Sequence, residues 1–249
     1  MNIEDLAVGL ATPNPLRLGT TALFLDLDGT LAPIADRPQD VHPDPRRSDL
    51  LARLSERLGG RLAIVSGRTL ADVDRILEGR VIPVAAVHGL VRREADGRTA
   101  QAAPHPALSR AALALRRMAG AGEGMIVEDK GLSATLHYRM APDQADRAQA
   151  AADRLAAETG LSLQKGDMVV ELRTPGPDKG DSVMRFMAAS PFAGAMPVFV
   201  GDDLTDEDGF AAAAELGGYG VLVGPSRDTK AAYRLAGVEE ALAWLEAAR

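Results

Sequence analysis

Short apolar segments alternate with longer segments of helical periodicity in the first part of the chain. Residues 21–25 form a continuous apolar run that ends at polar residues, which is typical of a parallel strand buried on both faces. Residues 44–58 carry leucines at helical spacing and stop at Gly59-Gly60, so they predict a helix. The same alternation continues with strands predicted at 61–65 and 84–87 and a helix at 69–77. This order predicts a parallel sheet wound with helices.

The middle of the chain has a different pattern. Asp96-Gly97 is a hairpin-type turn signal, and residues 174–177 (TPGP) are typical of a linker. Between them we predict a helix at 106–119, strands at 125–128 and 134–138, a helix at 143–159, and strands at 161–165 and 168–172 with a tight turn at Gly166-Asp167. The order α-β-β-α-β-β predicts a small antiparallel sheet that carries two helices.

The alternation of strand and helix returns after Lys179. Helices are predicted at 181–189, 206–216 and about 239–248, and strands at 197–200 and 219–223. We therefore predict an α/β protein whose Rossmann-like, parallel-sheet core is interrupted by an inserted α+β domain. The predicted division is core at 1–103, inserted domain at 104–176, and core again at 177–249.

Composition narrows the kinds of site and partner. Hydrophobic residues make up 46% and charged residues 25%, which is ordinary for a soluble globular protein. The absence of cysteine excludes disulfides, thiolate metal sites and cysteine nucleophiles, and it fits a cytoplasmic location. A net charge of -7 argues against nucleic acid as a partner. We expect neither a signal peptide nor a membrane span. Because the chain is acidic overall, a site that binds phosphate must concentrate positive charge locally through Lys, Arg or a metal ion.

The first candidate site follows the strand predicted at 21–25. Asp26 and Asp28 are separated by one residue, and ligands in open α/β sheets bind beyond the carboxyl ends of strands. If the chain leaves the strand at Gly29, the two carboxylates can converge, and close carboxylates need a cation or a shared proton. Mg²⁺ meets that need with oxygen ligands, and a carboxylate can also attack phosphorus. A capped loop with two acids is the alternative interpretation.

Two more polar segments lie where phosphate could bind. Ser66-Gly67-Arg68 follows the strand at 61–65, where a hydroxyl and backbone N–H groups can hold phosphate oxygens. Lys179 lies at the start of a helix, where it can neutralise a phosphoryl group and a nucleophile together. A simple helix N-cap and a solvated surface lysine are the respective alternatives.

A cluster of acids follows the strand at 197–200. Residues 201–208 (GDDLTDED) contain five acids, which repel one another unless a cation is present. Thr205 or Asp206 could also cap the following helix. Each of these segments is a weak signal alone, but their joint occurrence in this order at strand ends and helix starts is highly specific.

These four segments match the four motifs of the haloacid dehalogenase superfamily of phosphotransferases, and the insertion resembles that superfamily's C2-type cap. More narrowly, the chain resembles the trehalose-6-phosphate phosphatase family. The matching segments run from Phe24 to Phe210: FLDLDGTLAPI, IVSGR, VHGL, VEDKGLSATLHYR, MVVELRTPGPDKGDSV and FVGDDLTDEDGF. The family often has an acid after H-G-x, where this chain has Val91 and Arg92, which weakens any role for His88.

The resemblance implies roles for the core residues. Asp26 would be the nucleophile that forms an aspartyl phosphate, and Asp28 the general acid and base. The residues implied to hold the phosphoryl group are Ser66, Gly67, Arg68 and Lys179. The ligands implied for Mg²⁺ are Asp26, Asp202 and the backbone carbonyl of Asp28. Asp203 and Asp206 would orient those ligands or bind the ion through water.

The resemblance also implies that the cap binds the sugar through Glu128, Lys130, Arg139 and Glu171. This is sound chemistry, because carboxylates accept hydrogen bonds from sugar hydroxyls while Lys and Arg donate them. Aromatic residues make up only 4% of the chain, so stacking on sugar faces is not the expected mode. The alternative is that Glu128, Lys130 and Arg139 form a surface salt-bridge network on the cap sheet.

The implied function is hydrolysis of trehalose 6-phosphate to trehalose and phosphate, with functional coupling to a trehalose-6-phosphate synthase. A phosphatase with the same cap type that acts on sucrose phosphate or a mannosyl phosphoglycerate is an alternative. A non-catalytic sugar-phosphate sensor or a partner subunit of a synthase is another. Intact Asp26, Asp28, Lys179 and Asp202 argue against the sensor.

Overall fold

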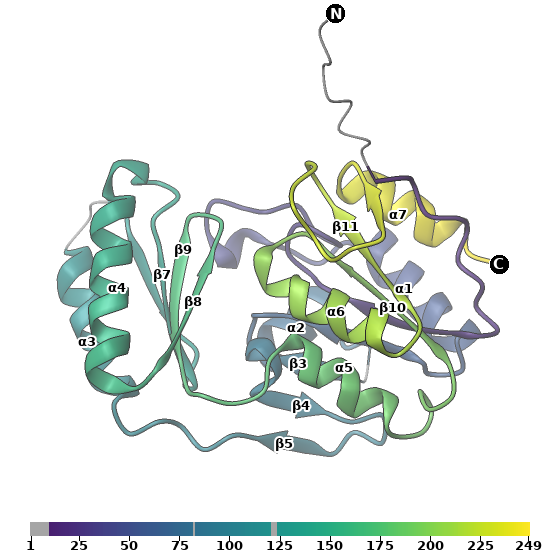
Figure 1. The fold of residues 1–249 in the computed structure, drawn as a ribbon, viewed down its shortest axis with the longest axis horizontal. Coiled ribbons are helices and arrows are strands. Elements are labelled where there is room, and N and C mark those ends of the chain that lie inside the picture. The colour runs from purple at the N-terminus through teal and green to yellow at the C-terminus, as the bar shows by residue number, and fades with distance from the viewer. Residues whose placement is uncertain (1–9, 82, 121–123) are drawn as a thin grey trace, which may run out of the picture.

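Two separate sheets organise the protein, which is described here by a computed structural model covering residues 10–81, 83–120 and 124–249. Figure 1 shows the larger sheet with its helices on the right and the smaller one on the left. The expectation of no signal peptide concerns residues 1–9, which lie outside the described residues. None of the helices in the described part of the chain is both long and apolar enough to cross a membrane.

The larger sheet has eight strands in the order β12-β11-β10-β1-β2-β3-β4-β5. The neighbours from β12 to β3 are parallel, and β4 and β5 are added antiparallel. The strands are β1 (Thr21–Leu25), β2 (Leu62–Val65), β3 (Val84–Ala86), β4 (Val91–Arg93), β5 (Thr99–Gln101), β10 (Met196–Gly201), β11 (Tyr219–Val223) and β12 (Tyr233–Leu235). Because β1 lies between β10 and β2, the strand order reverses beside it, which is where open α/β sheets bind ligands.

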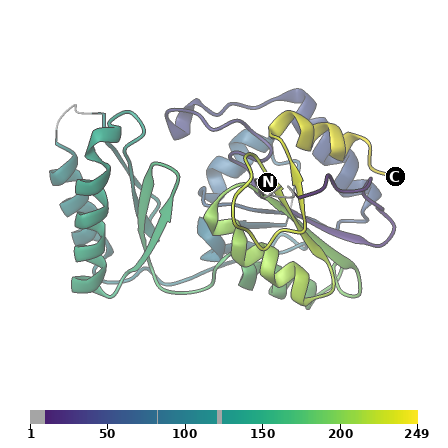
Figure 2. The same cartoon turned by 45° about the horizontal axis from the view of Figure 1, so that its top comes forward.

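Both faces of this sheet are buried, as the continuous apolar runs predict. Leu23 and Leu25 of β1 belong to the core on one face, whereas Ala22 and Phe24 belong to the core on the other. Figures 1 and 2 show α1 and α7 on one side of the sheet and α5 and α6 on the other. The helices are α1 (Pro45–Arg57), α2 (Leu70–Leu77), α5 (Lys179–Met187), α6 (Glu207–Glu215) and α7 (Val238–Glu246).

The smaller sheet lies within the predicted insertion and has the predicted element order. Its strands pair antiparallel in the order β6-β7-β9-β8. The elements are α3 (Leu108–Ala119), β6 (Ile126–Asp129), β7 (Ser133–His137), α4 (Ala145–Thr159), β8 (Ser162–Gly166) and β9 (Val169–Arg173). This confirms an α/β protein with a mostly parallel core sheet and an inserted α+β cap, while the boundaries at 103/104 and 176/177 stay a prediction.

The cap sheet has one apolar and one polar face, because neighbouring residues of a strand point to opposite sides. Leu136, Val170 and Leu172 pack against α3 and α4 on the apolar face. In both views these helices lie on the side of the sheet away from the core (Figures 1 and 2). On the other face Glu128, Thr135 and Glu171 are cross-strand neighbours. The polar face of the cap is therefore turned toward the core.

The structure differs from the sequence prediction in short elements and helix starts. Strands β4, β5 and β12 have three residues each and include polar residues, so they form no apolar run and were not predicted. The equally short β3 is wholly apolar and was predicted. Helix α5 begins at Lys179 rather than 181, because Asp178 and Asp181 form a capping box. The predicted turn at Gly166-Asp167 is the tip of the β8–β9 hairpin.

Candidate active site

One cleft lies between the carboxyl ends of the core strands and the polar face of the cap. It is a cavity of about 190 Å³ lined by residues of both parts. All the site residues predicted from sequence line it, apart from one: Asp26, Asp28, Ser66, Gly67, Arg68, Lys179, Asp202 and Asp203 from the core, and Glu128, Lys130, Arg139 and Glu171 from the cap. The exception is Asp206, which is fully buried beneath it.

Asp26 and Lys179 form a buried ion pair at the end of β1. The Asp26 amide donates to the carbonyl of Val200 (2.9 Å), which fixes the residue beside β10. Lys179 Nζ donates to Asp26 Oδ1 (2.9 Å) and to Asp206 Oδ1 (2.6 Å). Burial raises the pKa of Asp26 to about 8, with Asp206 and Asp28 adding to the effect and Lys179 opposing it. Burial alone would lower the pKa of Lys179, but Asp206 and Asp26 outweigh it and raise the pKa.

Asp202 approaches this pair from the end of β10. Its Oδ1 accepts from the hydroxyl of Thr30 (3.1 Å). Gly29 turns the chain in the left-handed region (φ +82°), and a Cβ there would lie 2.0 Å from Asp202 Oδ2. Glycine is therefore required for the two acidic segments to approach each other. Burial raises the pKa of Asp202 to about 9, reinforced by Asp26 and Asp206.

The carboxylates of this cluster suit a cation. Asp26, Asp202 and Asp206 each place an oxygen within 4.8 Å of the others. Both oxygens of Asp206 are engaged, because Oδ1 takes Lys179 and Oδ2 accepts from the amides of Asp202 (2.9 Å) and Asp203 (3.0 Å). One lysine for three acids leaves excess negative charge in the cluster. The raised pKa values of Asp26 and Asp202 indicate that protons neutralise this charge when no cation does. The donor set of oxygens fits a hard divalent ion.

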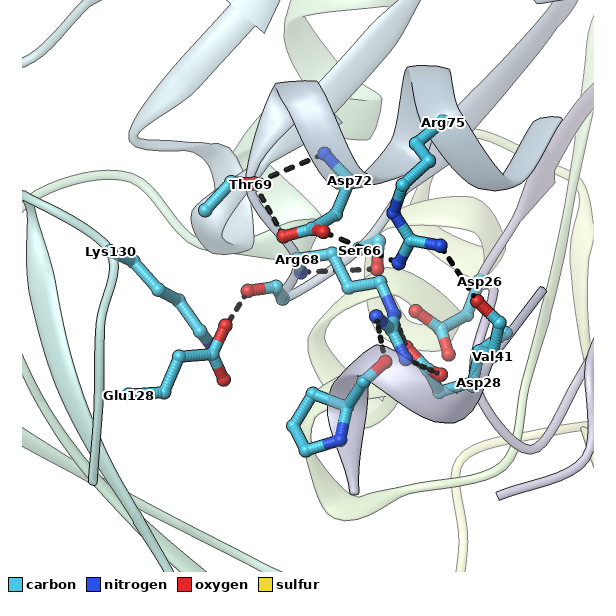
Figure 3. A network of polar contacts seen from close by, with 12 residues as sticks. Asp26, Asp28, Val41, Ser66, Arg68, Thr69, Asp72, Arg75, Glu128 and Lys130 are labelled. Atoms are coloured by element: carbon cyan, nitrogen blue, oxygen red, sulfur yellow. Dashed lines mark hydrogen bonds and ion pairs between the residues drawn. The ribbon is translucent and has the colours of Figure 1, made fainter. Parts of the chain in front are cut away.

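Arg68 holds Asp28 in a bidentate, two-pronged salt bridge. Arg68 Nε donates to Oδ2 (2.6 Å) and Nη2 to Oδ1 (2.7 Å), while Nη1 donates to the carbonyl of Pro38 (2.8 Å). Figure 3 shows the guanidinium of Arg68 over Asp28, with Asp26 close by. The loop that includes the 3₁₀ helix η1 (Pro38–Asp40) thus fixes the buried arginine in the wall of the cleft.

Ser66, Gly67 and Arg68 bridge β2 and α2. The Ser66 amide donates to Ala85 of β3 (2.8 Å), and the Ser66 hydroxyl accepts weakly from the Arg68 amide (3.3 Å). The N-cap of α2 is Thr69, whose hydroxyl accepts from the Asp72 amide (3.1 Å). The alternative that Ser66 is only an N-cap is therefore wrong, and its buried hydroxyl lies in the cleft.

On the cap, Lys130 lies between two carboxylates. Its Nζ is 3.5 Å from Glu171 Oε1 and 4.0 Å from Glu128 Oε2. Burial alone would raise the pKa of Glu171, but Lys130 and His88 outweigh it and hold that pKa below its usual range. The pKa of Glu128 is lowered in the same way, against its burial, by His137 (3.0 Å) and Lys130. With only 7% of its side chain exposed, Lys130 is not part of a surface network.

Arg139 lies apart from this group. Its Nη2 donates to the carbonyl (3.1 Å) and Oδ2 (2.8 Å) of Asp167 at the hairpin tip. It lines the cleft, and the structure shows no contact between it and Glu128 or Lys130. The alternative interpretation, a surface salt-bridge network of Glu128, Lys130 and Arg139, therefore lacks Arg139.

Several lining residues were not singled out from the sequence. His137 and Thr135 share the polar cap face with Glu128, and only the strand register reveals this. Ile34 and Met168 bring apolar surface from the core loop and the cap hairpin. His88, whose role the sequence left weak, is buried in the cleft wall against Glu171.

Comparison with known proteins agrees with this geometry. The trehalose-phosphatase family model matches residues 24–239. The chain is 40% identical to trehalose-6-phosphate phosphatase of Escherichia coli over 240 residues, covering 94% of this chain and 89% of that one. It is 38% identical to a probable trehalose-phosphate phosphatase of Sinorhizobium fredii, covering 89% and 83%.

A solved structure shows the same fold. The C-terminal domain of Candida albicans trehalose-6-phosphate phosphatase superposes with a TM-score of 0.84 at 22% identity, covering 95% of this chain and 97% of that one. The fold, the assembled motifs and the sequence matches over most of the chain agree. The chain belongs to the trehalose-phosphatase family.

Proposed function

We propose that this phosphatase hydrolyses trehalose 6-phosphate to trehalose and phosphate, with Asp26 as the nucleophile. The observation that carries the proposal is the position of Asp26, buried at the end of β1 beside Lys179 and facing the polar side of the cap. A carboxylate oxygen of Asp26 attacks phosphorus, and the bond from phosphorus to the sugar oxygen breaks. The product of this step is an aspartyl phosphate and a free sugar.

Asp28 supplies and removes the proton in the two halves of the reaction. Its carboxyl group gives a proton to the leaving sugar oxygen, and its carboxylate then takes one from the water that attacks the aspartyl phosphate. That water releases phosphate and restores Asp26. Asp28 must first leave the two-pronged contact with Arg68, and a bound phosphoryl group offers Arg68 another anion to hold.

The core holds the phosphoryl group with Ser66, Gly67, Arg68 and Lys179 in this proposal. An Mg²⁺ ion bound by Asp26, Asp202 and the backbone carbonyl of Asp28 would neutralise the clustered charge and position the phosphate. Asp203 and Asp206 orient that site, because the oxygens of Asp206 already hold Lys179 and the amides of residues 202 and 203. Glu128, Lys130, Arg139 and Glu171 bind the sugar hydroxyls.

We also place this activity in the cytoplasm, coupled to a synthase that makes the sugar phosphate. The supporting observations are the lack of cysteine and the family to which the chain belongs. A synthase would have to supply a disaccharide monophosphate, since this reaction only removes the phosphoryl group.

The deciding experiment measures phosphate release from a panel of sugar phosphates with Mg²⁺ and with EDTA. The panel contains trehalose 6-phosphate, sucrose phosphate, mannosyl phosphoglycerate and p-nitrophenyl phosphate. We expect the highest kcat/KM for trehalose 6-phosphate with Mg²⁺, and no phosphate release from any substrate in EDTA. A higher kcat/KM for another sugar phosphate would overturn the substrate, and binding without turnover would identify a sensor.

A further inference from the structure

One of the contacts between the cap and the core is buried beside residues 66–68, the phosphate-binding segment of the proposed function. Glu171 Oε2 of the cap is 3.1 Å from His88 Nε2 of the core. Next to this contact, Lys130 Nζ donates to the carbonyl of Gly67 (2.9 Å). Figure 3 shows Lys130 and Glu128 reaching from the cap toward the segment that carries Ser66 and Arg68. Side-chain exposure is below one tenth for His88, Glu171 and Lys130, so these contacts are shielded from water.

An unusual backbone conformation holds the imidazole of His88 in this position. Val87 and His88, in the 3₁₀ helix η2 (Val87–Gly89), both have positive φ angles, of 48° and 54°. Left-handed backbone is uncommon for residues other than glycine and is a true outlier for a β-branched residue such as valine. Strain of this kind persists where the surroundings impose it, often at functional sites.

The surroundings in this case are the phosphate-binding segment itself. The Val87 amide donates to the carbonyl of Arg68 (2.9 Å), and the His88 amide donates to that of Ser66 (3.0 Å). A Cβ at Gly67 would lie only 2.5 Å from His88 Nε2, so the ring lies directly against this glycine. The position of the His88 ring and the path of residues 66–68 are therefore fixed together.

We propose that His88 is a positioning residue that orients Glu171 for the sugar and joins the cap to the phosphate-binding segment. His88 donates Nε2–H to one oxygen of Glu171, which leaves the other oxygen toward Lys130 and the cleft. This proposal rests on the proposed function, in which Glu171 binds a sugar hydroxyl. It extends that function by assigning a role to a core residue whose side chain binds no part of the phosphoryl group.

The protonation of the pair agrees with this direction of the hydrogen bond. Burial lowers the pKa of His88 despite the nearby Glu171, so the ring is neutral and carries a single N–H. The pKa of Glu171 is held low, so its carboxylate is an acceptor. Nδ1 of His88 is buried and has no hydrogen-bond partner among the residues that the structure describes, which places the proton on Nε2.

The test compares His88→Gln with His88→Leu. The two new side chains are similar in size and equally unsuited to left-handed backbone, but only glutamine places an N–H near the position of Nε2. We expect His88→Leu to lower kcat/KM for trehalose 6-phosphate by about 10- to 150-fold, the value of a hydrogen bond to a charged group. We expect His88→Gln to stay within a few-fold of the unmodified enzyme. Turnover of p-nitrophenyl phosphate should change little in either variant, because the backbone N–H groups of residues 87 and 88, which hold residues 66–68, remain in both.

A double-mutant cycle separates positioning from a general structural effect. If His88 acts through Glu171, the leucine substitution should cost little more in a Glu171→Gln background, because residues that act as a unit are not additive. His42→Leu is the control, since His42 is exposed and is not among the residues that line the cleft. It should leave both activities unchanged.

Three results would overturn the proposal: equal loss in His88→Leu and His88→Gln, equal loss on both substrates, or additive losses in the cycle. If His88→Leu does not fold, as a melting curve would show, His88→Asn replaces it. Asparagine accepts left-handed backbone but is too short to reach Glu171, so it should lose sugar-phosphate turnover where glutamine keeps it. If the unmodified enzyme hydrolyses p-nitrophenyl phosphate but not trehalose 6-phosphate, the proposed function fails instead.

Discussion

The core and cap ends of the cleft both gather carboxylates, but they balance the charge in opposite ways. In the core, three acids share Lys179, and the pKa of Asp26 rises to about 8 and that of Asp202 to about 9. In the cap, Glu128 and Glu171 have cationic or hydrogen-bonding neighbours close by, and the pKa of each falls. The core thus keeps a charge that only a proton or a cation removes, whereas the cap acids are already satisfied.

This difference separates chemistry from recognition. A nucleophile and a metal site need carboxylates that are not fully neutralised by the protein, so that the cation completes the site. A sugar-binding face needs acceptors that stay ionised at neutral pH and can exchange a protein partner for a hydroxyl. The same residue type therefore serves two purposes, and its neighbours decide which.

The largest effect should come from removing the nucleophile. An amide cannot attack phosphorus, so Asp26→Asn should lower kcat for trehalose 6-phosphate and for p-nitrophenyl phosphate by at least about 10³-fold. The measurement is steady-state phosphate release beside a melting curve. Asp49→Asn, an exposed acid on α1, is the control and should keep full activity. Substantial turnover by a pure Asp26→Asn preparation would rule out this nucleophile.

Removing the metal should act on the core end in the same general way. After exhaustive chelation, Asp26 either keeps a proton and cannot attack phosphorus, or ionises beside Asp202 and repels the phosphate dianion. Turnover of both substrates should therefore be lost. Added Mg²⁺ should restore it and raise the melting temperature, since a ligand that binds only the folded state stabilises it. Full activity in the chelated protein would contradict the assignment of Mg²⁺.

Removing a cap acid should affect only the larger substrate. Glu128→Ala should lower kcat/KM for trehalose 6-phosphate by about 10- to 150-fold and leave p-nitrophenyl phosphate nearly unchanged. Asp129→Ala is the matched control, because Asp129 is the next residue of β6 and pairs with the exposed Arg116. Equal loss on both substrates, or on neither, would show that Glu128 does not bind the sugar, and a melting curve would reveal a role in the cap fold.

The smallest effects are opposite pH dependences of stability. Asp26 and Asp202 keep protons in the metal-free folded state that the unfolded chain has released, because their folded pKa values are raised from 3.8. Their contribution to stability therefore falls as pH rises from about 4 to about 9. Asp202→Asn should make the fall in melting temperature over this range shallower, by about 2–4 °C per kcal/mol gained. If the melting temperature of Asp202→Asn fell with pH as steeply as that of the unmodified protein, Asp202 would not carry a raised pKa in the core cluster.

The cap should show the reverse sign at acidic pH. Glu171 has a lowered folded pKa, so its stabilising contribution is complete above its unfolded value of 4.5 and is lost as pH falls through the folded pKa. Glu171→Gln should therefore lower the melting temperature at pH 6 and matter less as the solution becomes strongly acidic. A loss of stability that is the same at every pH would mean that the carboxylate charge is not involved.

Most of the architecture could be predicted from the sequence, because it depends on local periodicity. Continuous apolar runs predicted the buried strands β1, β2 and β10. The change of pattern in the middle of the chain predicted the cap. The polar segments at the strand ends predicted which residues would meet, since parallel strands bring their carboxyl ends to one edge. Short strands with a polar residue, such as β12 (YRL), were missed because they form no apolar run, whereas the equally short but wholly apolar β3 was predicted.

The pairings within the site could not be predicted, because they join residues far apart in the sequence. Arg68 binds Asp28 across 40 positions, Lys130 binds Gly67 across 63, and His88 binds Glu171 across 83. The sequence alone determined which residue types lie at the ends of the strands. The sheet register, the docking of the cap on the core and the left-handed backbone at Val87 and His88 decided which charges face one another, because burial and distance arise only once distant segments are packed together.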